Sequence, residues 1–326
     1  MTTLETKYMN LNLRNPIIVA SSGLTKTEEK IKQCEEAGAG AVVLKSLFEE
    51  SLAREDWGVD SSTAHHTEVY DYLRSELQLQ YGPQEYCNTI FNVKKQVEIP
   101  IIASINCVSS KWWPSFARQI EAAGADALEL NVFTTAYDPA TESAEIEQLY
   151  YQLIEEVKGR IDIPVAMKIG SNFTSLPNVA YNLCQKGADA LVLFNRFTEP
   201  DIDINNLSLR TTFTFSRKED MHKTLRGIAL LAGKVSCDLA ATTGIHSGGD
   251  IIKMLLAGAT AVQLASVLYK KGLSVISEMT AEIDEWMRKH NFSSIEDFRG
   301  KLSFARVANP EHYLRVQFME KIRGYE

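Results

Sequence analysis

The chain has 326 residues, of which 45% are hydrophobic and 23% are charged, a composition typical of a globular protein with a substantial core. Its formal net charge of -8 argues against nucleic acid or an anionic membrane surface as a partner. No apolar run approaches the roughly 18 residues of a membrane span, and the N-terminus lacks a signal-peptide pattern, so we expect a cytoplasmic protein.

The cysteines are scattered singly, without the paired spacing of a metal site. They are Cys34, Cys87, Cys107, Cys184 and Cys237. This usage predicts reduced thiols, most of them packed, and no metal centre.

Four nearly identical phrases recur along the chain, and each joins the end of a helical pattern to an apolar run. They are EAGAGAVVL at 36–44, AAGADALEL at 122–130, QKGADALVL at 185–193 and LAGATAVQL at 256–264. Glycine adopts positive φ without Cβ strain, so each phrase predicts a helix end that leads into a buried strand.

Further apolar runs bring the number of expected strands to eight. They are NPIIVASS at 15–22, IPIIASIN at 99–106, IPVAMKIG at 163–170 and CDLAATTG at 237–244. Amphipathic segments of helical length lie between the strands, at 27–37, 111–123, 143–160, 174–186, 220–233 and 248–257. Eight alternating strands and helices predict an α/β fold, a (β/α)8 TIM barrel with a parallel sheet.

The domain organisation follows from the same pattern. No boundary indicates a second domain, so we expect one domain over 1–326. Two long stretches, about 47–82 and 197–219, predict lid-like insertions over the carboxyl ends of the strands. The tail from about 273 to 326 is polar and helical in pattern.

Polar residues end six of the expected strands. They are Ser21, Lys45, Asn106, Asn131, Lys168 and Asn195. Active sites of such barrels lie at this end, and a buried polar group left unpaired costs ~1–3 kcal/mol. The set therefore predicts a site for a polar ligand.

The last two strands indicate a phosphate group in that ligand. TTGIHSGGD at 242–250 and QLASVLYKKG at 263–272 place small residues, including Ala265 and Ser266, at the start of helical turns. The asparagines match the donors and acceptors of a flavin ring, and Lys168 suits the edge that gains negative charge on reduction. Another alternative uses Lys168 or Lys45 as a Schiff-base lysine in an aldolase-like barrel.

The ordered set of strand ends resembles the dihydroorotate dehydrogenase family, an FMN-containing barrel. The matching phrases are NPIIVAS, LKS, SIN, ELN, MKI, LFNR and TTGIHSGGDIIKMLLAGATAVQLAS, which span roughly residues 5 to 275. The chain looks closest to the soluble class 1 branch, and within it to a divergent group of dihydroorotate dehydrogenase-like proteins. The resemblance implies hydride transfer from dihydroorotate, or a related substrate, to flavin N5.

The resemblance also implies a role for individual residues. Lys45, Asn131 and Asn195 would bind the substrate, with Thr134 at the position of the catalytic base and Lys45 as its charge partner. The FMN site would consist of Ala20, Ser21, Lys45, Ser46, Asn106, Asn131, Lys168, Phe194, Gly244, Ala265 and Ser266.

The chain departs from the family pattern in the substrate half of the site. Thr134 replaces the cysteine or serine that acts as base, and Ala136 replaces an asparagine two residues beyond it. SELQLQYGP at 75–83 replaces the substrate-gripping loop, and FSRKEDMHK at 215–223 replaces a glycine-rich turn. A threonine hydroxyl has a pKa far above neutrality, so it needs a relay or a water to take the proton on.

Besides the Schiff-base alternative, two functions remain open from the sequence. The first is an FMN-dependent oxidoreductase acting on dihydroorotate or a similar compound. The second is a flavin-binding barrel without that activity, which serves as an electron-transfer or scaffold subunit. The sequence does not name the electron acceptor, and family analogy alone favours a homodimer.

Overall fold

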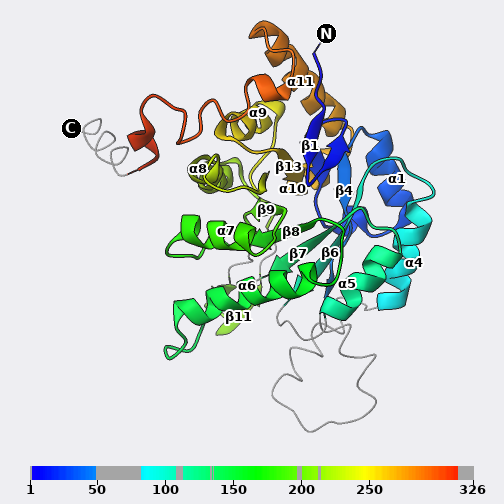
Figure 1. Cartoon of the computed structure of the whole chain (residues 1–326), viewed down its shortest axis with the longest axis vertical. Helices are drawn as coiled ribbons and strands as arrows, with labels where there is room; N and C mark the ends of the chain where they lie inside the picture. The colour runs from blue at the N-terminus through cyan, green and yellow to red at the C-terminus, as the bar shows by residue number, and fades with distance from the viewer. Residues whose placement is uncertain are drawn as a thin grey trace.

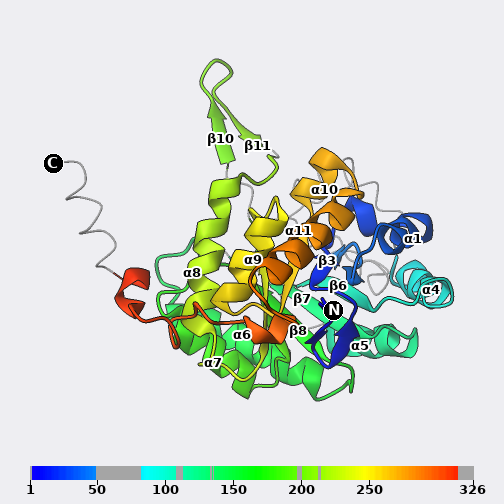
Figure 2. The same ribbon diagram turned by 90° about the horizontal axis from the view of Figure 1, so that it is seen from above.

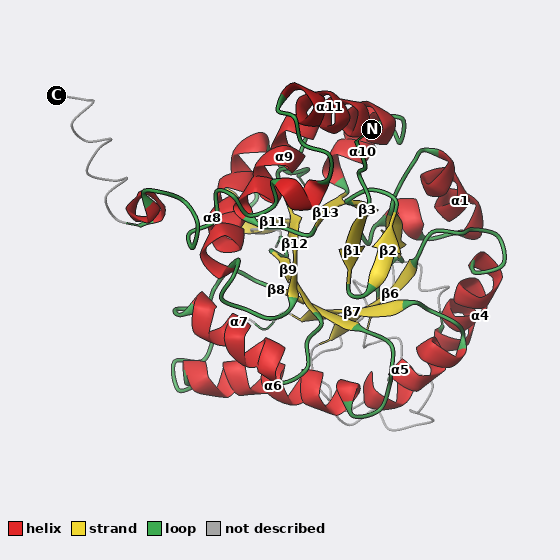
Figure 3. Cartoon of the chain, turned by 45° about the horizontal axis from the view of Figure 1, so that its top comes forward, coloured by secondary structure: helices red, strands yellow, loops and turns green. Residues whose placement is uncertain are grey.

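The structure is a computed structural model that describes residues 2–48, 82–107, 113–132, 134, 136–196, 200–211 and 214–314. Its centre is a closed barrel of eight parallel strands. Helices surround the strands, as Figures 1 and 3 show. The strands are β3 (Ile17–Val19), β4 (Ala41–Val43), β6 (Ile101–Cys107), β7 (Ala127–Val132), β8 (Val165–Ile169), β9 (Ala190–Leu193), β12 (Asp238–Thr242) and β13 (Ala261–Leu264). Pairing of β4 with β6 closes the ring. The predicted TIM barrel and its eight strands are confirmed.

The helices alternate with the strands and pack around them. They include α1 (Glu28–Glu36), α4 (Pro83–Val93), α5 (Trp113–Ala122), α6 (Ser143–Lys158), α7 (Leu176–Gln185), α8 (Met221–Leu231), α9 (Gly248–Ala257), α10 (Ser266–Lys271) and α11 (Val275–Lys289). All six helical segments expected from the sequence are present, with ends within two residues of the prediction. Local signals explain the ends of α9: the Ser247 side chain accepts from the Asp250 N–H, and Gly258 stops the helix at φ 118°.

Two hydrophobic layers hold the barrel together. The larger one lies between the strands and the helices. The smaller one fills the barrel with side chains such as Ile18, Val43, Ile102 and Ala166, which alternate along the strands with residues of the outer layer.

A hairpin at the N-terminus closes one end of the barrel, and Figure 3 shows it within the ring of strands. Its strands are β1 (Thr6–Tyr8) and β2 (Leu11–Leu13), and Tyr8 and Leu13 are fully buried in the inner layer. The sequence pattern did not predict this hairpin. Its two-residue turn uses Met9 and Asn10 at positive φ, a geometry suited to hairpins that methionine rarely signals.

The predicted insertions are described only in part. Most of 47–82 lies outside the described residues, and the short strand β5 (Leu47–Phe48) at its start pairs with β6. The stretch 197–219 contains an antiparallel hairpin, β10 (Pro200–Asp203) and β11 (Ser208–Thr211), which projects from the barrel in Figure 2. The C-terminal stretch contains α11, followed by turns and the short 3-10 helices Ile295–Asp297 and Pro310–Tyr313.

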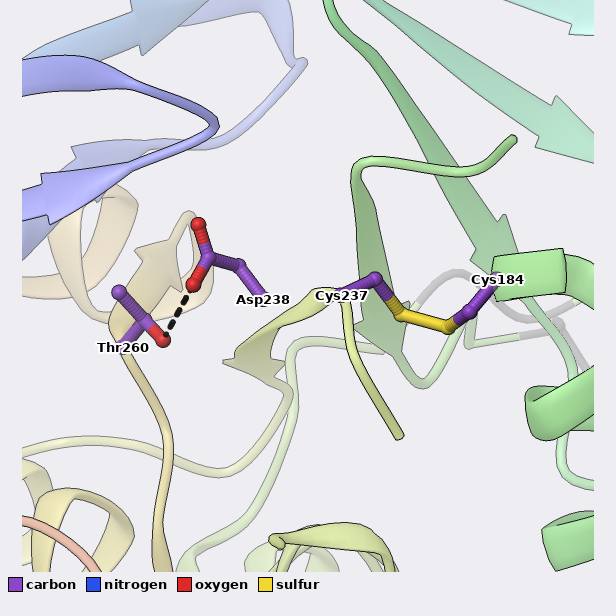
Figure 4. Close-up of a disulfide and its surroundings, with 4 residues drawn as sticks. All are labelled: Cys184, Cys237, Asp238 and Thr260. Carbon is purple, nitrogen blue, oxygen red and sulfur yellow. Dashed lines mark hydrogen bonds between the residues drawn. A yellow bond between two sulfur atoms is a disulfide. The ribbon is translucent and has the colours of Figure 1, made fainter. Parts of the chain in front are cut away.

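The expectation of reduced thiols was wrong for two cysteines. Cys184, in the last turn of α7, and Cys237, just before β12, form a disulfide with a Cα to Cα distance of 5.7 Å (Figure 4). They are 53 residues apart in the chain, and only the barrel topology brings them together at the starting ends of the strands. Cys34 is a buried thiol, and burial raises its pKa to about 11. Among the described helices, none is long and apolar enough to cross a membrane.

Candidate active site

Polar side chains stand in one row across neighbouring strands at the carboxyl end of the barrel. Asn106 on β6 is the register partner of Asn131 on β7, which in turn is the partner of Lys168 on β8. Ala166, two residues before Lys168, belongs to the inner layer of the barrel. Because strand side chains alternate, Lys168 also faces inward. The structure therefore brings these three predicted residues together.

A second predicted pair meets beside that row. The Nδ2 of Asn195, which follows β9, donates a 2.7 Å hydrogen bond to the Oδ1 of Asn131. The backbone N–H of Asn195 is fixed by the carbonyl of Ile169 at the end of β8. The bond leaves Asn131 Nδ2 and Asn195 Oδ1 as a donor and an acceptor for a ligand, as the recognition of an amide-bearing ring requires.

Lys168 is held by two buried residues that the sequence analysis gave no role. Its Nζ lies 3.6 Å from Glu129 Oε1 and 3.2 Å from Gln263 Oε1, and Gln263 Nε2 donates to Glu129 Oε2. Glu129 and Gln263 are each 1% exposed. A signal for both existed: Glu129 is two residues before Asn131 on the same strand face, and Gln263 interrupts the apolar run AVQL.

Three serines form a hydrogen-bonded chain across β3, β4 and β6. Ser46 Oγ lies 2.9 Å from Ser21 Oγ and 2.8 Å from Ser104 Oγ, and Ser21 Oγ also accepts from the Ser46 N–H. Tyr86 of α4 holds the Ser104 end of this chain, since its hydroxyl donates to the carbonyl of Ser104 and accepts from the Ser104 N–H. The predicted Ser21 and Ser46 are therefore adjacent. Ser104 was missed, although it lies two residues before Asn106.

Lys45 lies at the end of β4 in a partly enclosed position. Its Nζ sits 5.6 Å from the centre of the Phe48 ring, and its backbone N–H donates to the Thr25 carbonyl. Burial lowers the pKa of Lys45, and the positive charge of Lys26 lowers it further. The site therefore contains a desolvated lysine that an incoming carboxylate would stabilise in its charged form.

The turn after β12 brings the backbone close to another segment. Thr243 and Gly244 both have positive φ, of 75° and 77°. A Cβ on Gly244 would lie 2.2 Å from the backbone nitrogen of Met221, so only glycine fits. Within the described part of the chain, the N–H groups of Gly244 and Ile245 donate no hydrogen bond. They are available for an anion.

The ends of β13, β3 and β9 complete this side of the barrel. Ser266 begins α10, and its Oγ accepts from the Ser216 N–H. Ala20 donates its N–H to the carbonyl of Leu264, which places the end of β3 beside Ala265. Phe194 contributes mainly backbone here, because its ring packs toward Gly227 of α8 while its carbonyl accepts from the Thr243 hydroxyl.

Thr134 lies beyond the end of β7, beside a pocket of about 260 Å³. Its Oγ1 is buried and has no hydrogen-bond partner among the described residues. Ala136, Glu147, Tyr150 and Asn172 also line the pocket. Burial raises the pKa of the Tyr150 phenol, and a hydrogen bond with the Thr134 backbone partly offsets this shift. Glu147 lines the same pocket as Thr134, and its Oε2 accepts a 3.4 Å hydrogen bond from the Tyr151 hydroxyl.

The arrangement can hold a planar polar ring with an attached phosphate. The asparagines and Lys168 supply donors, acceptors and a positive charge at one level of the barrel, while the turns after β12 and β13 supply small residues and backbone N–H groups. Thr134 Oγ1 is a buried polar atom that lacks a hydrogen-bond partner among the described residues, so a ligand or a water could bond it.

Comparison with known proteins identifies a single family. The sequence model described as dihydroorotate dehydrogenase matches residues 3–287. The catalytic subunit of dihydroorotate dehydrogenase B (NAD(+)) from Thermoplasma volcanium is 26% identical over 308 residues, 92% of this chain and 98% of that protein. The subunit of the same name from Pyrococcus horikoshii is 27% identical over 91% of this chain and 97% of its own length. The subunit of the same name from Methanocaldococcus jannaschii is 26% identical over 89% of this chain and 95% of its own length.

Proposed function

The chain belongs to the dihydroorotate dehydrogenase family, and from that premise we propose that it is an FMN-dependent oxidoreductase acting on a CH–CH group of dihydroorotate or a related carboxylated compound. One observation carries the proposal: Asn106, Asn131 and Lys168 share one register level of the barrel, with Asn195 bonded to Asn131. This row offers the hydrogen bonds and the charge that a flavin and a planar substrate both need.

The residues fit FMN. Lys168 would lie at the ring edge that gains negative charge, with Asn106 and Asn131 matching the ring's polar atoms. The N–H groups of Gly244 and Ile245, together with the start of α10 at Ser266, would bind the phosphate, while Ala20, Ser21 and Ser46 would line the ring. When bound, FMN supplies the hydride acceptor for the oxidation.

The substrate half of the site uses three residues of the chain. Asn195 Oδ1 and Asn131 Nδ2 would orient a planar ring through its amides. Lys45 would bind the substrate carboxylate, and this contact would hold the lysine in its charged form despite its desolvation.

Thr134 stands where the proton would be removed. Its hydroxyl is buried, and at neutral pH a threonine holds its own proton, so it can take the substrate proton only while it passes its own on. Glu147 lies in the adjoining pocket and is the carboxylate to which a water could carry the proton. This position supports proton transfer away from Thr134 through the pocket.

A Schiff-base role for Lys168 is less well supported. Such a lysine needs its amine available for attack on a carbonyl. Lys168 is instead engaged by Glu129 and Gln263 within the barrel. The arrangement favours electrostatic stabilisation over covalent catalysis.

We also propose partners for this activity. The relatives are named catalytic subunits of NAD(+)-linked enzymes, which supports a second protein that passes electrons to a pyridine nucleotide.

A homodimer is supported by the hairpin of β10 and β11, whose Ile202, Ile204, Leu207 and Leu209 are all strongly exposed. We also propose a cytoplasmic location, in which the Cys184–Cys237 disulfide is an unusual feature.

An anaerobic absorbance spectrum before and after addition of dihydroorotate tests the function. We expect flavin bands that bleach on addition. Thr134→Ala should slow the bleaching by about 100-fold or more, while Thr141→Ala, at an exposed threonine, should leave it unchanged. Flavin that binds but stays oxidised would favour the electron-transfer subunit, and a chain that takes up no flavin on reconstitution would overturn the cofactor assignment.

A further inference from the structure

A buried carboxylate lies directly beneath the lysine of the proposed flavin site. Glu129 Oε1 is 3.6 Å from Lys168 Nζ, and Gln263 bridges the two side chains by accepting from Lys168 and donating to Glu129. The three residues come from β7, β8 and β13, so the network crosses the interior of the barrel. Water has little access, because Lys168 is 9% exposed and its two partners are 1% exposed.

Three polar side chains of the described residues face Glu129, each from a different element. Lys168 faces it from β8 and the neutral Gln263 from β13. Tyr8 faces it from the hairpin that closes the barrel, and burial, then Glu129, then Asp238 raise the pKa of the Tyr8 phenol well above its usual value. Tyr8 therefore remains neutral near pH 7. The balance of charge at Lys168 thus depends on Glu129.

We propose that Glu129 sets the reduction potential of the bound flavin by offsetting the charge that Lys168 presents to it, an inference that rests on the proposed function. Glu129 would act from behind Lys168, without contact with the cofactor. It is a positioning residue that acts through Lys168, while Gln263 holds the lysine and the carboxylate in register without adding charge.

The physical basis is the different charge of the two flavin states. Reduction brings negative charge to the ring edge, and a nearby ammonium group favours that state. A carboxylate on the far side of the same ammonium group opposes the effect, and the opposition is strong because the barrel interior has a low effective dielectric constant. Removal of the Glu129 charge should therefore favour reduced flavin, and a second carboxylate should disfavour it.

The chain offers a charge exchange that tests this directly. Glu129→Gln removes the negative charge, and Gln263→Glu adds a negative charge in contact with Lys168. The double variant again has one carboxylate, now at position 263 on β13. The midpoint potential of each FMN-loaded protein would be measured by dye-coupled titration with a chemical reductant, without dihydroorotate. Thermal unfolding of the same proteins would report their structural integrity.

The expected shifts have opposite signs. In Glu129→Gln the preference for reduced over oxidised FMN should rise about tenfold, a shift of about 30 mV to more positive potential for a two-electron couple. Gln263→Glu should shift the potential in the negative direction, and the double variant should return to within twofold of the wild-type preference. If one single variant unfolds, the other still tests the sign of the potential shift. Glu129→Asp then serves as its control, because it keeps the charge and should keep the potential.

Two results would overturn the inference. Shifts of the same sign in both single variants would mean that loosened packing, and not charge, moves the potential. Unchanged potentials in FMN-loaded variants would show that Glu129 does not tune the cofactor, while the proposed function would stand. Failure of the wild-type chain to bind FMN would instead reject the proposed function, and the inference with it.

Discussion

Asn195 donates a hydrogen bond of 2.7 Å to the side-chain oxygen of Asn131, which joins the segment after β9 to the end of β7. The two residues are 64 positions apart in the sequence. Because each amide uses one polar atom on the other, the pair presents a fixed donor and a fixed acceptor to the barrel opening. The pair should therefore act as one recognition element.

Loss of either asparagine should lower kcat/KM. Loss of both should raise the activation free energy by less than the sum of the two single effects. We expect Asn131→Ala and Asn195→Ala each to lower kcat/KM by about 10- to 100-fold, with a coupling of ~0.5–3 kcal/mol between them. Steady-state kinetics of the two single variants and the double variant measure this coupling. Asn178→Ala, at an exposed position on α7, is the control. Strictly additive effects would show that the hydrogen bond has no part in substrate binding.

The lowered pKa of Lys45 predicts a pH dependence. Because burial and Lys26 lower the pKa in the folded chain, the ammonium form is lost at a lower pH than in an ordinary lysine. We expect kcat/KM for a carboxylated substrate to fall as the pH rises through this pKa. Lys26→Gln removes the repelling charge, so its alkaline limb should move to higher pH, whereas Lys32→Gln on α1 should not move it. A limb at the same pH in all three proteins would contradict the assignment.

The same shift has a consequence for stability. The unfolded chain binds a proton at Lys45 up to higher pH than the folded chain does, so this residue should make the free energy of unfolding rise as pH increases between the two pKa values. Chemical denaturation over an alkaline pH series, compared with Lys45→Met, would measure the effect. A smaller slope is expected in the variant.

Gly244 should tolerate no side chain. Its φ of 77° and the Met221 backbone nitrogen, 2.2 Å from the position of a Cβ, predict that Gly244→Ala lowers the free energy of unfolding by roughly 2–3 kcal/mol and weakens FMN binding. Gly249→Ala is the control, because a Cβ there would meet only the Ser247 hydroxyl at 3.7 Å and alanine favours a helix. Denaturant titration and flavin fluorescence measure the two effects. Equal behaviour of both variants would contradict the proposed role of the turn.

The exposed face of the β10–β11 hairpin predicts self-association. The register pairs Ile202 with Leu209, and Ile204 and Leu207 follow on the exposed hairpin, with exposures of 65–88% for the four. A stable contact needs roughly 1,000 Å² of buried surface, and two hairpins packed face to face would each contribute these aliphatic side chains. Leu207→Asn with Leu209→Thr should convert a dimer into a monomer in analytical ultracentrifugation, and Ser208→Ala should not. A wild-type chain that sediments as a monomer would remove the basis for this contact.

Much of the fold could be predicted because its signals are local and repeated. The glycine after each helix and the apolar run that follows are the same in four units, so the eight strands and six helices could be placed from short stretches. The hairpin at Thr6–Leu13 could not, because its turn at Met9 and Asn10 carries no glycine and its burial depends on the barrel that it closes. Local periodicity alone does not contain that information.

The candidate site was likewise predictable only in part. Asn106, Asn131, Lys168 and Asn195 were recognisable as polar ends of apolar strands. The contacts of Glu129 with Lys168 and Gln263 depend on how the ring of strands closes, since β7 and β13 lie 134 residues apart at these positions. The pairing of Cys184 with Cys237 has the same cause, and isolated cysteines gave no sign of it.

That disulfide also changes what a protease could achieve. The β10–β11 hairpin lies between Cys184 and Cys237, so a cut in the hairpin falls inside a covalently closed loop of the chain. Both halves of the barrel would remain one molecule after cleavage, and their mobility in a denaturing gel would reveal two fragments only after reduction. Cleavage in the projecting β10–β11 hairpin would therefore leave the two parts of the chain joined by the disulfide.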